Sequence, residues 1–372
     1  MPLQHLDTDH FLRTVWQRQA LLIRQGLAGF TCPVDGDDLA GLACEAEAES
    51  RLVELRDGHW RLRHGPFSET TFSGLAPRDW TLLVQRVDHW IPEVADLVAE
   101  FDFLPRWRID DIMISYAVTG GGVGPHYDNY DVFLIQGSGR REWRIGQHCD
   151  DDSALRGDTE LRLLVDFQEQ ARHTLEPGDV LYLPPGLAHW GTALSDDCVT
   201  LSVGFRAPSA AELLGRWCEE VCAQLTESER YRDTPATLAA GNRLTADHID
   251  SLRALLQSRL DDANLIRSFG ELVTELPDGN PQVATQGSLP RGGLRRALDA
   301  RLTLYASPHG ILLFANGASL VCDSGAQATL THICDLLPDQ QLADTTWSRL
   351  AEDHPTIAQF LLSTAALSSA DE

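Results

Sequence analysis

The spacing of apolar and polar positions changes twice along the chain and divides it into three parts. Residues 9–105 mix helical spacing, as in IPEVADLVAEFDF, with a hairpin pattern that turns at Asp57-Gly58. Residues 109–206 carry short apolar runs separated by Gly, Pro and Asp, which is typical of the strands of a β-sandwich or barrel, jelly rolls included. The pattern therefore predicts an α+β fold with a β-rich core.

Helical spacing begins after Pro208. Ser209 and Glu212 form a capping-box pattern that predicts a helix through LLGRWCEEVCAQL. A second helix is predicted to begin near Thr245, because four apolar positions fall on one stripe: Ile249, Leu252, Leu256 and Leu260. Neither helix carries a core of its own, so we expect both to pack on the barrel or to pair with another subunit.

Residues 277–293 have the composition of a linker. The segment after them predicts a hairpin in RLTLYASPHGILLFANGASLVC and helices around THICDLLPD and TIAQFLLSTAAL, an order that fits a small winged-helix-like domain. Its few basic residues favour a scaffold over direct DNA binding. We therefore predict three parts: 1–208 as the catalytic domain, 209–276 as a helical segment and 277–372 as the C-terminal domain.

Composition and hydropathy argue against a nucleic-acid-binding, a membrane or a secreted protein. The formal net charge is −25, with 55 acidic side chains against 30 basic ones, and every basic residue is arginine. Such a surface repels phosphate backbones and attracts basic proteins or peptides. The chain contains no apolar run of membrane-spanning length, and its first residues do not form a secretory signal, so we expect a cytoplasmic protein. The eight cysteines form no CxxC pair, which favours free thiols.

Two distant segments offer metal ligands. His126 and Asp128 lie two residues apart in GPHYDNYDVF, so an extended chain directs both side chains to one face. His189 follows a predicted strand in EPGDVLYLPPGLAHWG. Two histidines and one carboxylate on one face of an octahedral metal leave three positions open, as in non-haem iron(II) oxygenases. Zinc is not excluded by the ligand types alone.

A 2-oxoglutarate-dependent oxygenase also needs a cation for the far carboxylate of its co-substrate, and a guanidinium group suits this role. In the predicted strand REWRIG, Arg141 shares a face with Trp143 and Ile145, while Arg140 and Arg144 share the other. The apolar face should point into the barrel, so we predict that Arg141 is the binding cation. Ser115, in DIMISYAV, is a candidate for an additional hydroxyl contact.

At this point the residues resemble the JmjC family, and within it the bacterial ribosomal oxygenases. The resemblance runs through DDIMISYAV, GGGVGPHYDNYDVFLIQGSGRREWRIG, LEPGDVLYLPPGLAHWG and SVGFRAP, over residues 109–208. It implies a double-stranded β-helix of the jelly-roll (cupin) type, followed by a helical dimerisation segment and a winged-helix-like C-terminal domain. It also implies a homodimer.

The resemblance implies roles for the same residues. The iron(II) ligands and catalytic centre fall on His126, Asp128 and His189, and the 2-oxoglutarate contacts on Arg141 and Ser115, with dioxygen as the second co-substrate. The implied substrate is an arginine side chain of a ribosomal protein, the large-subunit L-sixteen protein. Four residues that flank the motif are candidates for substrate contact by proximity: Asp110, Asp111, Tyr130 and Asp131.

Three alternatives stay open. The same chemistry could act on another protein or on a small molecule, and residues around the iron do not decide this. A non-catalytic metal-binding cupin could act as a sensor or scaffold, although an inward Arg141 argues against it. Lysine demethylation of histones fits the barrel but has no further support in the sequence.

Overall fold

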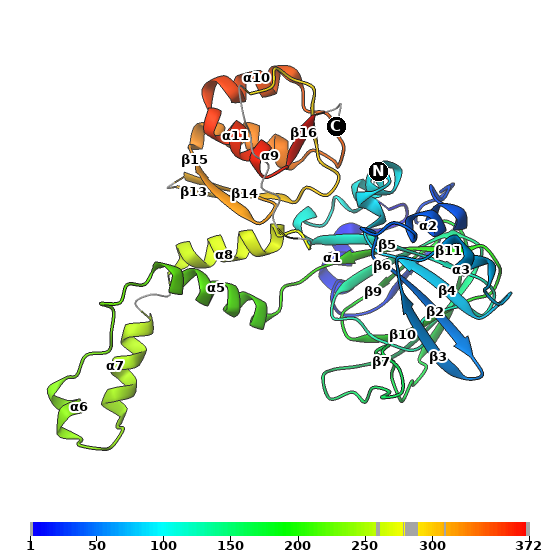
Figure 1. Cartoon of the computed structure of the whole chain (residues 1–372), viewed down its shortest axis with the longest axis horizontal. Helices are drawn as coiled ribbons and strands as arrows, with labels where there is room; N and C mark the ends of the chain where they lie inside the picture. Colours follow the sequence, from blue (N-terminus) through cyan, green and yellow to red (C-terminus); the bar gives the residue numbers. More distant parts are fainter. Residues whose placement is uncertain (1–2, 258–260, 278, 280–288, 309, 370–372) are drawn as a thin grey trace. The chain divides into compact units, whose positions relative to one another are not determined.

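The computed structural model describes residues 3–257, 261–277, 279, 289–308 and 310–369. The chain forms two compact units, Met1–Ala207 and Pro208–Glu372 (Figure 1). The finer division of the second unit into a helical segment and a C-terminal domain stays a prediction. Among the described residues, no helix combines the length and apolar character that crossing a membrane requires.

The first unit is built from two antiparallel sheets. The larger has the strand order β1-β9-β6-β11-β5-β4-β2-β3 and the smaller the order β10-β7-β8. The strands of the larger sheet are β1 (Leu21–Ile23), β2 (Ser50–Arg56), β3 (His59–His64), β4 (Trp80–Val84), β5 (Ile109–Ala117), β6 (Asp131–Ser138), β9 (Val180–Leu183) and β11 (Cys198–Phe205). Those of the smaller sheet are β7 (Arg141–His148), β8 (Ala171–Leu175) and β10 (Leu187–Ala193).

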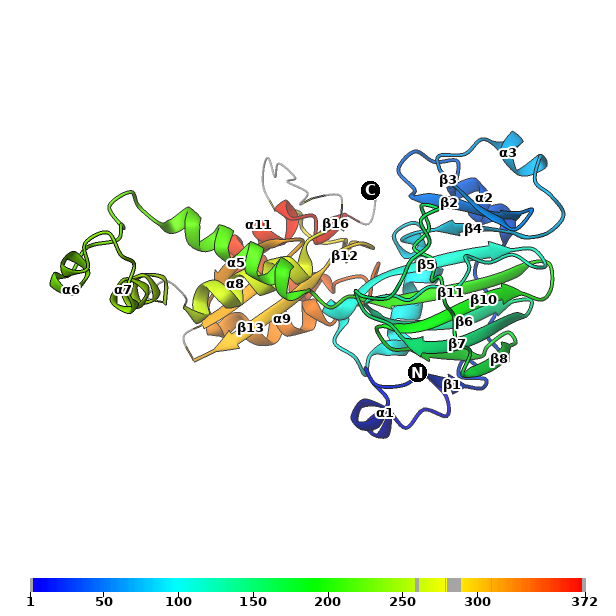
Figure 2. The ribbon, with the colours of Figure 1, turned by 90° about the horizontal axis from the view of Figure 1, so that it is seen from below.

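Strand β6 shows how the two sheets share a core. Because successive side chains alternate between faces, Phe133 and Ile135 enter the cluster on one face of the large sheet. Val132 and Leu134 enter a second cluster, which also contains residues of β7, β8 and β10. Both faces of β6 are therefore buried, which explains its nearly continuous apolar run. In Figure 2, β6, β11 and β5 run side by side, as their pairing requires.

The neighbouring strands β5 and β11 are apolar on one face and more polar on the other. Ile112 and Ile114 point into the main core. Met113 and Ser115, on the opposite face of β5, line a cavity, and so do Thr200 and Ser202 of β11. The alternation in the sequence thus distinguishes the core face of the large sheet from the face that carries a site.

Shorter elements accompany the large sheet, and all of them except the last contribute side chains to the cluster on its core face. They are α1 (Thr8–Thr14), α2 (Gly36–Leu42), α3 (Glu69–Ser73), η1 (Val87–His89), α4 (Pro92–Ala95), η2 (Asp96–Phe101) and η3 (Arg106–Arg108). The predicted hairpin at Asp57-Gly58 is confirmed by the pairing of β2 with β3. The single helix predicted from IPEVADLVAEFDF is only partly right. The α-helix ends at Ala95 and continues as a 3-10 helix, which buries Val98 and Phe101.

The second unit begins with α5 (Ala210–Gln224), and its predicted capping box of Ser209 and Glu212 is confirmed. Three further helices follow, α6 (Pro235–Ala239), α7 (Ala246–Gln257) and α8 (Asp262–Thr274). The sequence predictions contained α7 but missed α6 and α8. Leu260 of the predicted stripe and most of the predicted linker lie outside the described residues, whereas Ile249, Leu252 and Leu256 are exposed.

A small sheet organises the rest of this unit. Its strands β13 (Leu302–Ser307), β14 (Gly310–Ala315) and β15 (Ala318–Cys322) form two consecutive hairpins in the segment for which one was predicted. Gly270 of α8 lies against Phe314 on one face, so closely that a Cβ atom there would meet the ring at 2.3 Å. Leu313 packs on the other face with residues of α9 (Figure 1). The remaining elements are β12 (Leu294–Arg296), η4 (Ser324–Ala326), α9 (Gln327–Cys334), α10 (Asp344–Asp353), α11 (Pro355–Ser363) and β16 (Leu367–Ser369).

Candidate active site

Backbone pairing brings the two predicted histidine ligands together. His126 lies in the loop between β5 and β6, and its N–H donates to the carbonyl of His189 at 3.0 Å. The N–H of His189 donates in return to the carbonyl of His126 at 2.8 Å. The glycine-rich loop before His126 allows this approach, because a Cβ atom on Gly122 would lie 2.2 Å from the carbonyl oxygen of Gly191 in β10. Two segments distant in sequence are thus held in register by main-chain contacts.

Both imidazoles are oriented by the same kind of hydrogen bond. Nδ1 of His126 lies 2.9 Å from the carbonyl oxygen of Gly124, and Nδ1 of His189 lies 2.9 Å from that of Leu187. A carbonyl oxygen only accepts, so each Nδ1 carries the proton. The lone pair of each ring is then on Nε2, the atom available to a metal.

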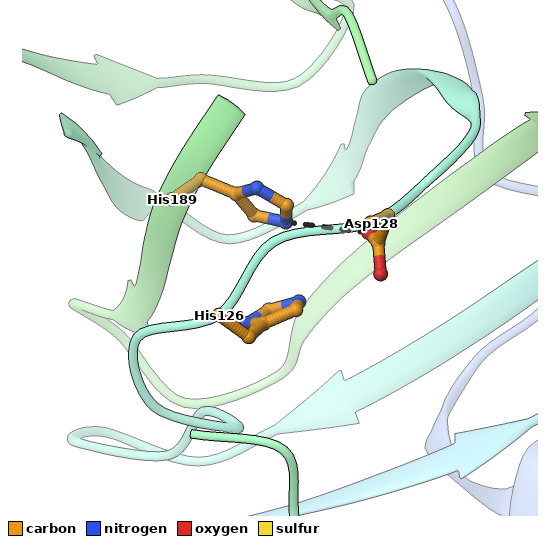
Figure 3. A group of neighbouring side chains, drawn as sticks. All are labelled: His126, Asp128 and His189. Atoms are coloured by element: carbon orange, nitrogen blue, oxygen red, sulfur yellow. Dashed lines mark ion pairs between the residues drawn. The ribbon is translucent and has the colours of Figure 1, made fainter. Parts of the chain in front are cut away.

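The third ligand completes a compact group (Figure 3). The carboxylate of Asp128 lies 3.5 Å from Nε2 of His189. One ligand atom from each of His126, Asp128 and His189 can be chosen such that all lie within 4.8 Å of one another. The main-chain carbonyl of Asp128 accepts a hydrogen bond from the N–H of Gly186, which ties this loop to the start of β10. The structure therefore brings the predicted triad together, and no other group of this kind occurs in the described ranges.

Burial sets the protonation state of His189. The side chain is almost fully enclosed, and desolvation, followed by the neighbouring His126, lowers its pKa to about 4. A histidine with so low a pKa is neutral near pH 7. It can therefore offer its lone pair without first losing a proton.

The triad opens into a cavity of about 560 Å³, a size typical of small-molecule sites. Arg141, Ser115, Met113 and Leu134 are among its walls. The hydroxyl of Ser115 lies 3.5 Å from the carbonyl oxygen of Thr200, a weak contact that leaves it able to meet a ligand.

Arg141 is buried in this wall with an incomplete set of partners. Its side chain is 5% exposed, and within the described part of the chain its Nε and Nη2 atoms have no hydrogen-bond partner. The burial pattern of β7 alternates from Arg141 to Ile145, which confirms the predicted inward face of Arg141, Trp143 and Ile145. On the outer face, Arg144 lies 3.6 Å from the ring centroid of Trp190. A buried guanidinium with free donors is costly unless a ligand meets it.

The four flanking residues that are candidates for substrate contact lie in different places in the structure. Tyr130 lines the cavity, whereas Asp110, Asp111 and Asp131 are not among the lining residues that the structure describes. The proposal for Asp131 is wrong. Its carboxylate is fully buried on the core face and accepts a hydrogen bond from Tyr182 at 2.6 Å.

The sequence predictions missed one wall of the cavity. Arg51 and Val53 of β2, with Thr81 and Leu83 of β4, line it from strands that precede the predicted barrel. Leu163, from the connection between β7 and β8, closes another side. The short apolar run in TLLVQ could have indicated a strand, but its position beside β5 depends on long-range pairing.

The amino-acid sequence matches both a family model and individual proteins. A family model described as the JmjC domain matches residues 96–213. The chain is 40% identical over 278 residues to the Escherichia coli protein named ribosomal protein uL16 3-hydroxylase, covering 73% of this chain and 72% of that protein. It is 38% identical to a Haemophilus influenzae protein named probable ribosomal oxygenase, covering 73% and 68% of the two chains.

Solved structures have a similar fold over nearly the whole length of this chain. The X-ray structure of Escherichia coli YcfD matches with a TM-score of 0.86 and 32% identity, covering 99% of this chain and all of that one. A complex of the same ribosomal oxygenase with cobalt and 2-oxoglutarate matches with a TM-score of 0.83, covering 99% of each. The fold and the site thus define a JmjC-type oxygenase, an enzyme. Within that class, the chain belongs to the ribosomal oxygenase family.

Proposed function

We propose that this enzyme is an iron(II)- and 2-oxoglutarate-dependent oxygenase that hydroxylates an arginine side chain of a large-subunit ribosomal protein. In this proposal, His126, Asp128 and His189 hold the iron, and Arg141 binds the far carboxylate of 2-oxoglutarate. One observation carries it: a two-histidine, one-carboxylate group shares a single cavity with a buried arginine, two of whose nitrogens have no hydrogen-bond partner in the described part of the chain.

The donor set fits iron. Two Nε2 lone pairs and one carboxylate occupy one side of the metal and leave positions for a bidentate co-substrate and dioxygen. Catalytic zinc sites can use similar ligands, so support for iron comes also from the family to which the chain belongs. When bound, iron with 2-oxoglutarate and dioxygen supplies the oxidising power that breaking an unactivated C–H bond requires.

The side chains of the cavity bind the co-substrate and orient it. Arg141 supplies a permanent positive charge in a planar fork that matches a carboxylate, and Ser115 adds a hydroxyl on the neighbouring wall. Apolar walls such as Met113 and Leu134 keep bulk water away from the reacting centre. The neutral His189 keeps the ligand set ready at physiological pH.

For the substrate we propose an arginine of the large-subunit protein uL16, known also as L-sixteen. The name of the Escherichia coli relative supports this choice. The net charge of −25 favours a basic ribosomal partner, and the cavity can hold an extended side chain beside the co-substrate. Another protein or a small molecule is the alternative.

We also propose that the enzyme is a homodimer that forms through residues 209–276. Leu214 of α5 and Leu256 of α7 are 56% and 64% exposed in the single chain, and Leu238 of α6 is 68% exposed. Leucines at this level of exposure on several helices favour association. Light scattering should give twice the chain mass, and Leu256→Asp should shift it toward the monomer, whereas a single-chain mass for the unaltered protein would contradict the dimer.

The reaction is tested with full-length protein loaded anaerobically with iron(II). Oxygen, 2-oxoglutarate and peptides that cover uL16 and other ribosomal proteins are then added, and peptide masses are read alongside succinate. We expect one oxygen atom to be gained on an arginine of one uL16 peptide, matched by succinate, and no gain when that arginine is replaced by lysine.

Other outcomes separate the alternatives. Succinate with a mass gain on a different peptide would keep the oxygenase and replace the substrate. Succinate without any mass gain would keep the oxygenase and discard the peptide substrate, since the 2-oxoglutarate is then consumed without hydroxylation of any peptide. No succinate from folded, iron-loaded protein would favour a metal-binding sensor or scaffold.

A further inference from the structure

Arg141 shares one feature with other side chains of the cavity wall, a buried nitrogen without a hydrogen-bond partner in the described part of the chain. Of the side chains that line the cavity in the described part of the chain, three keep a buried nitrogen without a partner: Arg51, Arg141 and Trp143. Arg51 lies on β2 and already donates through Nη2 to the side-chain oxygen of Gln85. Trp143 is different, because the indole Nε1–H is its single donor and has no partner within the described residues.

Trp143 stands between the two ends of the proposed co-substrate site. It follows Arg141 by two residues in β7, and the Arg141 guanidinium carbon lies 5.7 Å from the centroid of its ring. On the other side, the ring centroids of Trp143 and His189 are 5.9 Å apart. A molecule that reaches from the metal ligands to Arg141 would therefore pass along this indole.

The packing of the ring shows which of its atoms lie closest to β10. Trp143 is paired with Gly191 of β10, and a Cβ atom on Gly191 would lie 2.7 Å from the Cη2 and Cζ3 atoms of the indole. These atoms belong to the benzene edge of the ring. The Nε1 atom belongs to the pyrrole ring and is not among the three atoms nearest to this position. The absence of a side chain at Gly191 thus makes room for the benzene ring, while the Nε1–H has no partner among the described residues.

We propose that the Trp143 Nε1–H donates a hydrogen bond to the distal carboxylate of 2-oxoglutarate, beside the guanidinium of Arg141. This inference rests on the proposed function, since it assumes that this carboxylate binds at Arg141. A carboxylate has more acceptor positions than one guanidinium fork uses. A second donor in a dry wall satisfies both the anion and the buried indole, and such charge-assisted bonds are stronger than neutral ones.

The test compares two phenylalanine variants by calorimetry on the full-length protein, with manganese(II) in place of iron and oxygen excluded. Trp143→Phe keeps an aromatic ring and removes the donor. Trp190→Phe is the matched control, because Trp190 lies on the outer face of β10 against Phe167. The ligands are 2-oxoglutarate and 2-oxobutyrate, which shares the 2-oxo acid group and lacks the distal carboxylate.

We expect Trp143→Phe to raise the Kd for 2-oxoglutarate by about tenfold, the effect of losing one hydrogen bond to a charged group. It should leave the Kd for 2-oxobutyrate unchanged, and Trp190→Phe should leave both unchanged. Unaltered 2-oxoglutarate binding by Trp143→Phe would overturn the inference. An equal loss for both acids would also overturn it, because the ring would then act at the chelating end. Metal-independent binding, or none, by the unaltered protein would instead remove the proposed function and this inference with it.

A second measurement needs no variant to fold. In zinc-loaded protein labelled with ¹⁵N on its nine indoles, the Trp143 signal is assigned through its contact with the His189 ring. Its Nε1–H resonance should move downfield when 2-oxoglutarate is added and stay in place with 2-oxobutyrate. A resonance that does not respond to 2-oxoglutarate, while binding is seen by calorimetry, would overturn the inference.

Discussion

Asp131 and Arg141 are both buried charged residues of the first unit, and they differ in how far their hydrogen-bonding groups are paired. The Asp131 carboxylate, on the core face of the large sheet, accepts hydrogen bonds from Tyr182 at 2.6 Å, Gln17 at 3.0 Å and Arg108 at 3.1 Å. Arg141, on the cavity side, keeps two guanidinium nitrogens without any partner in the described residues.

The difference separates a structural charge from a functional one. Burial raises the pKa of Asp131, but three donors hold the carboxylate, so its removal would leave those donors unpaired. Two of the donor nitrogens of Arg141 have no partner among the residues that the structure describes, so folding alone leaves their burial uncompensated. We therefore expect changes on the core side to lower stability and changes on the cavity side to lower binding and turnover.

The largest effect should come from the metal ligands. We predict that His126→Ala lowers turnover by more than about a hundredfold, because loss of partners that merely orient a ligand already costs 10- to 100-fold. Succinate formation, bound iron and circular dichroism measure the three relevant properties. The variant should stay folded, since His126 is held mainly through its backbone pairing with His189. Retained iron-dependent activity would contradict the triad.

On the core side, Asp131→Asn should lower the free energy of unfolding by about 3 kcal/mol, as expected when one partner of a buried ion pair is removed. Chemical unfolding measures this, with the exposed Asp151→Asn as the control. Binding of 2-oxoglutarate by the folded variant should be unchanged. A loss of co-substrate affinity at unchanged stability would show that Asp131 serves the site after all.

On the cavity side, Arg141→Met should have the opposite pattern of effects, on co-substrate binding rather than on stability. Losing a bidentate, charge-assisted contact should weaken 2-oxoglutarate binding by roughly a hundredfold. The unfolding free energy should not fall, because an apolar side chain replaces a buried and unsatisfied charge. Calorimetry and thermal unfolding measure both, with Arg140→Met on the outer face as the control. Equal effects of the two variants would show that the assignment of faces is wrong.

The same contrast shows how far the sequence alone could lead. The inward direction of Arg141 and the shared side of His126 and Asp128 could be predicted, because they follow from the two-residue period of an extended chain. The structural role of Asp131 could not, since its three donors come from distant segments. Sequence proximity to the motif was a poor guide, and the pairing of strands decided the outcome.

Other features depended on packing that no local pattern records. The close packing of the Trp143 ring on Gly191 depends on the pairing of β7 with β10, and the cavity wall on β2 and β4 depends on their pairing beside β5. Helix α8 is a different case, because its signal was present. Asp261 caps it, with its side chain accepting from the N–H of Asn264, a pattern visible in the sequence.

The smallest expected effect concerns His189 in metal-free protein. Its folded-state pKa, about 4, lies below the ordinary value of 6.5, so the unfolded chain binds more protons. The stability that this neutral histidine contributes is present above pH 6.5, falls as the pH drops and levels off below about 4. Between pH 7 and 5.5 the loss should be about 1 kcal/mol.

Unfolding free energies of metal-free wild type and His189→Gln across this range isolate the contribution, because the variant lacks the titrating ring. The difference between the two proteins should shrink as the pH falls, and Asp131→Asn should not alter that trend, since its carboxylate lies on the other face of the sheet. Parallel pH curves for wild type and His189→Gln would mean that the pKa of His189 is not lowered by folding, so that the folded protein protonates this ring as the pH falls below about 6.5. The cavity side would then carry a second unsatisfied charge, and the contrast with the core side would have to rest on Arg141 alone.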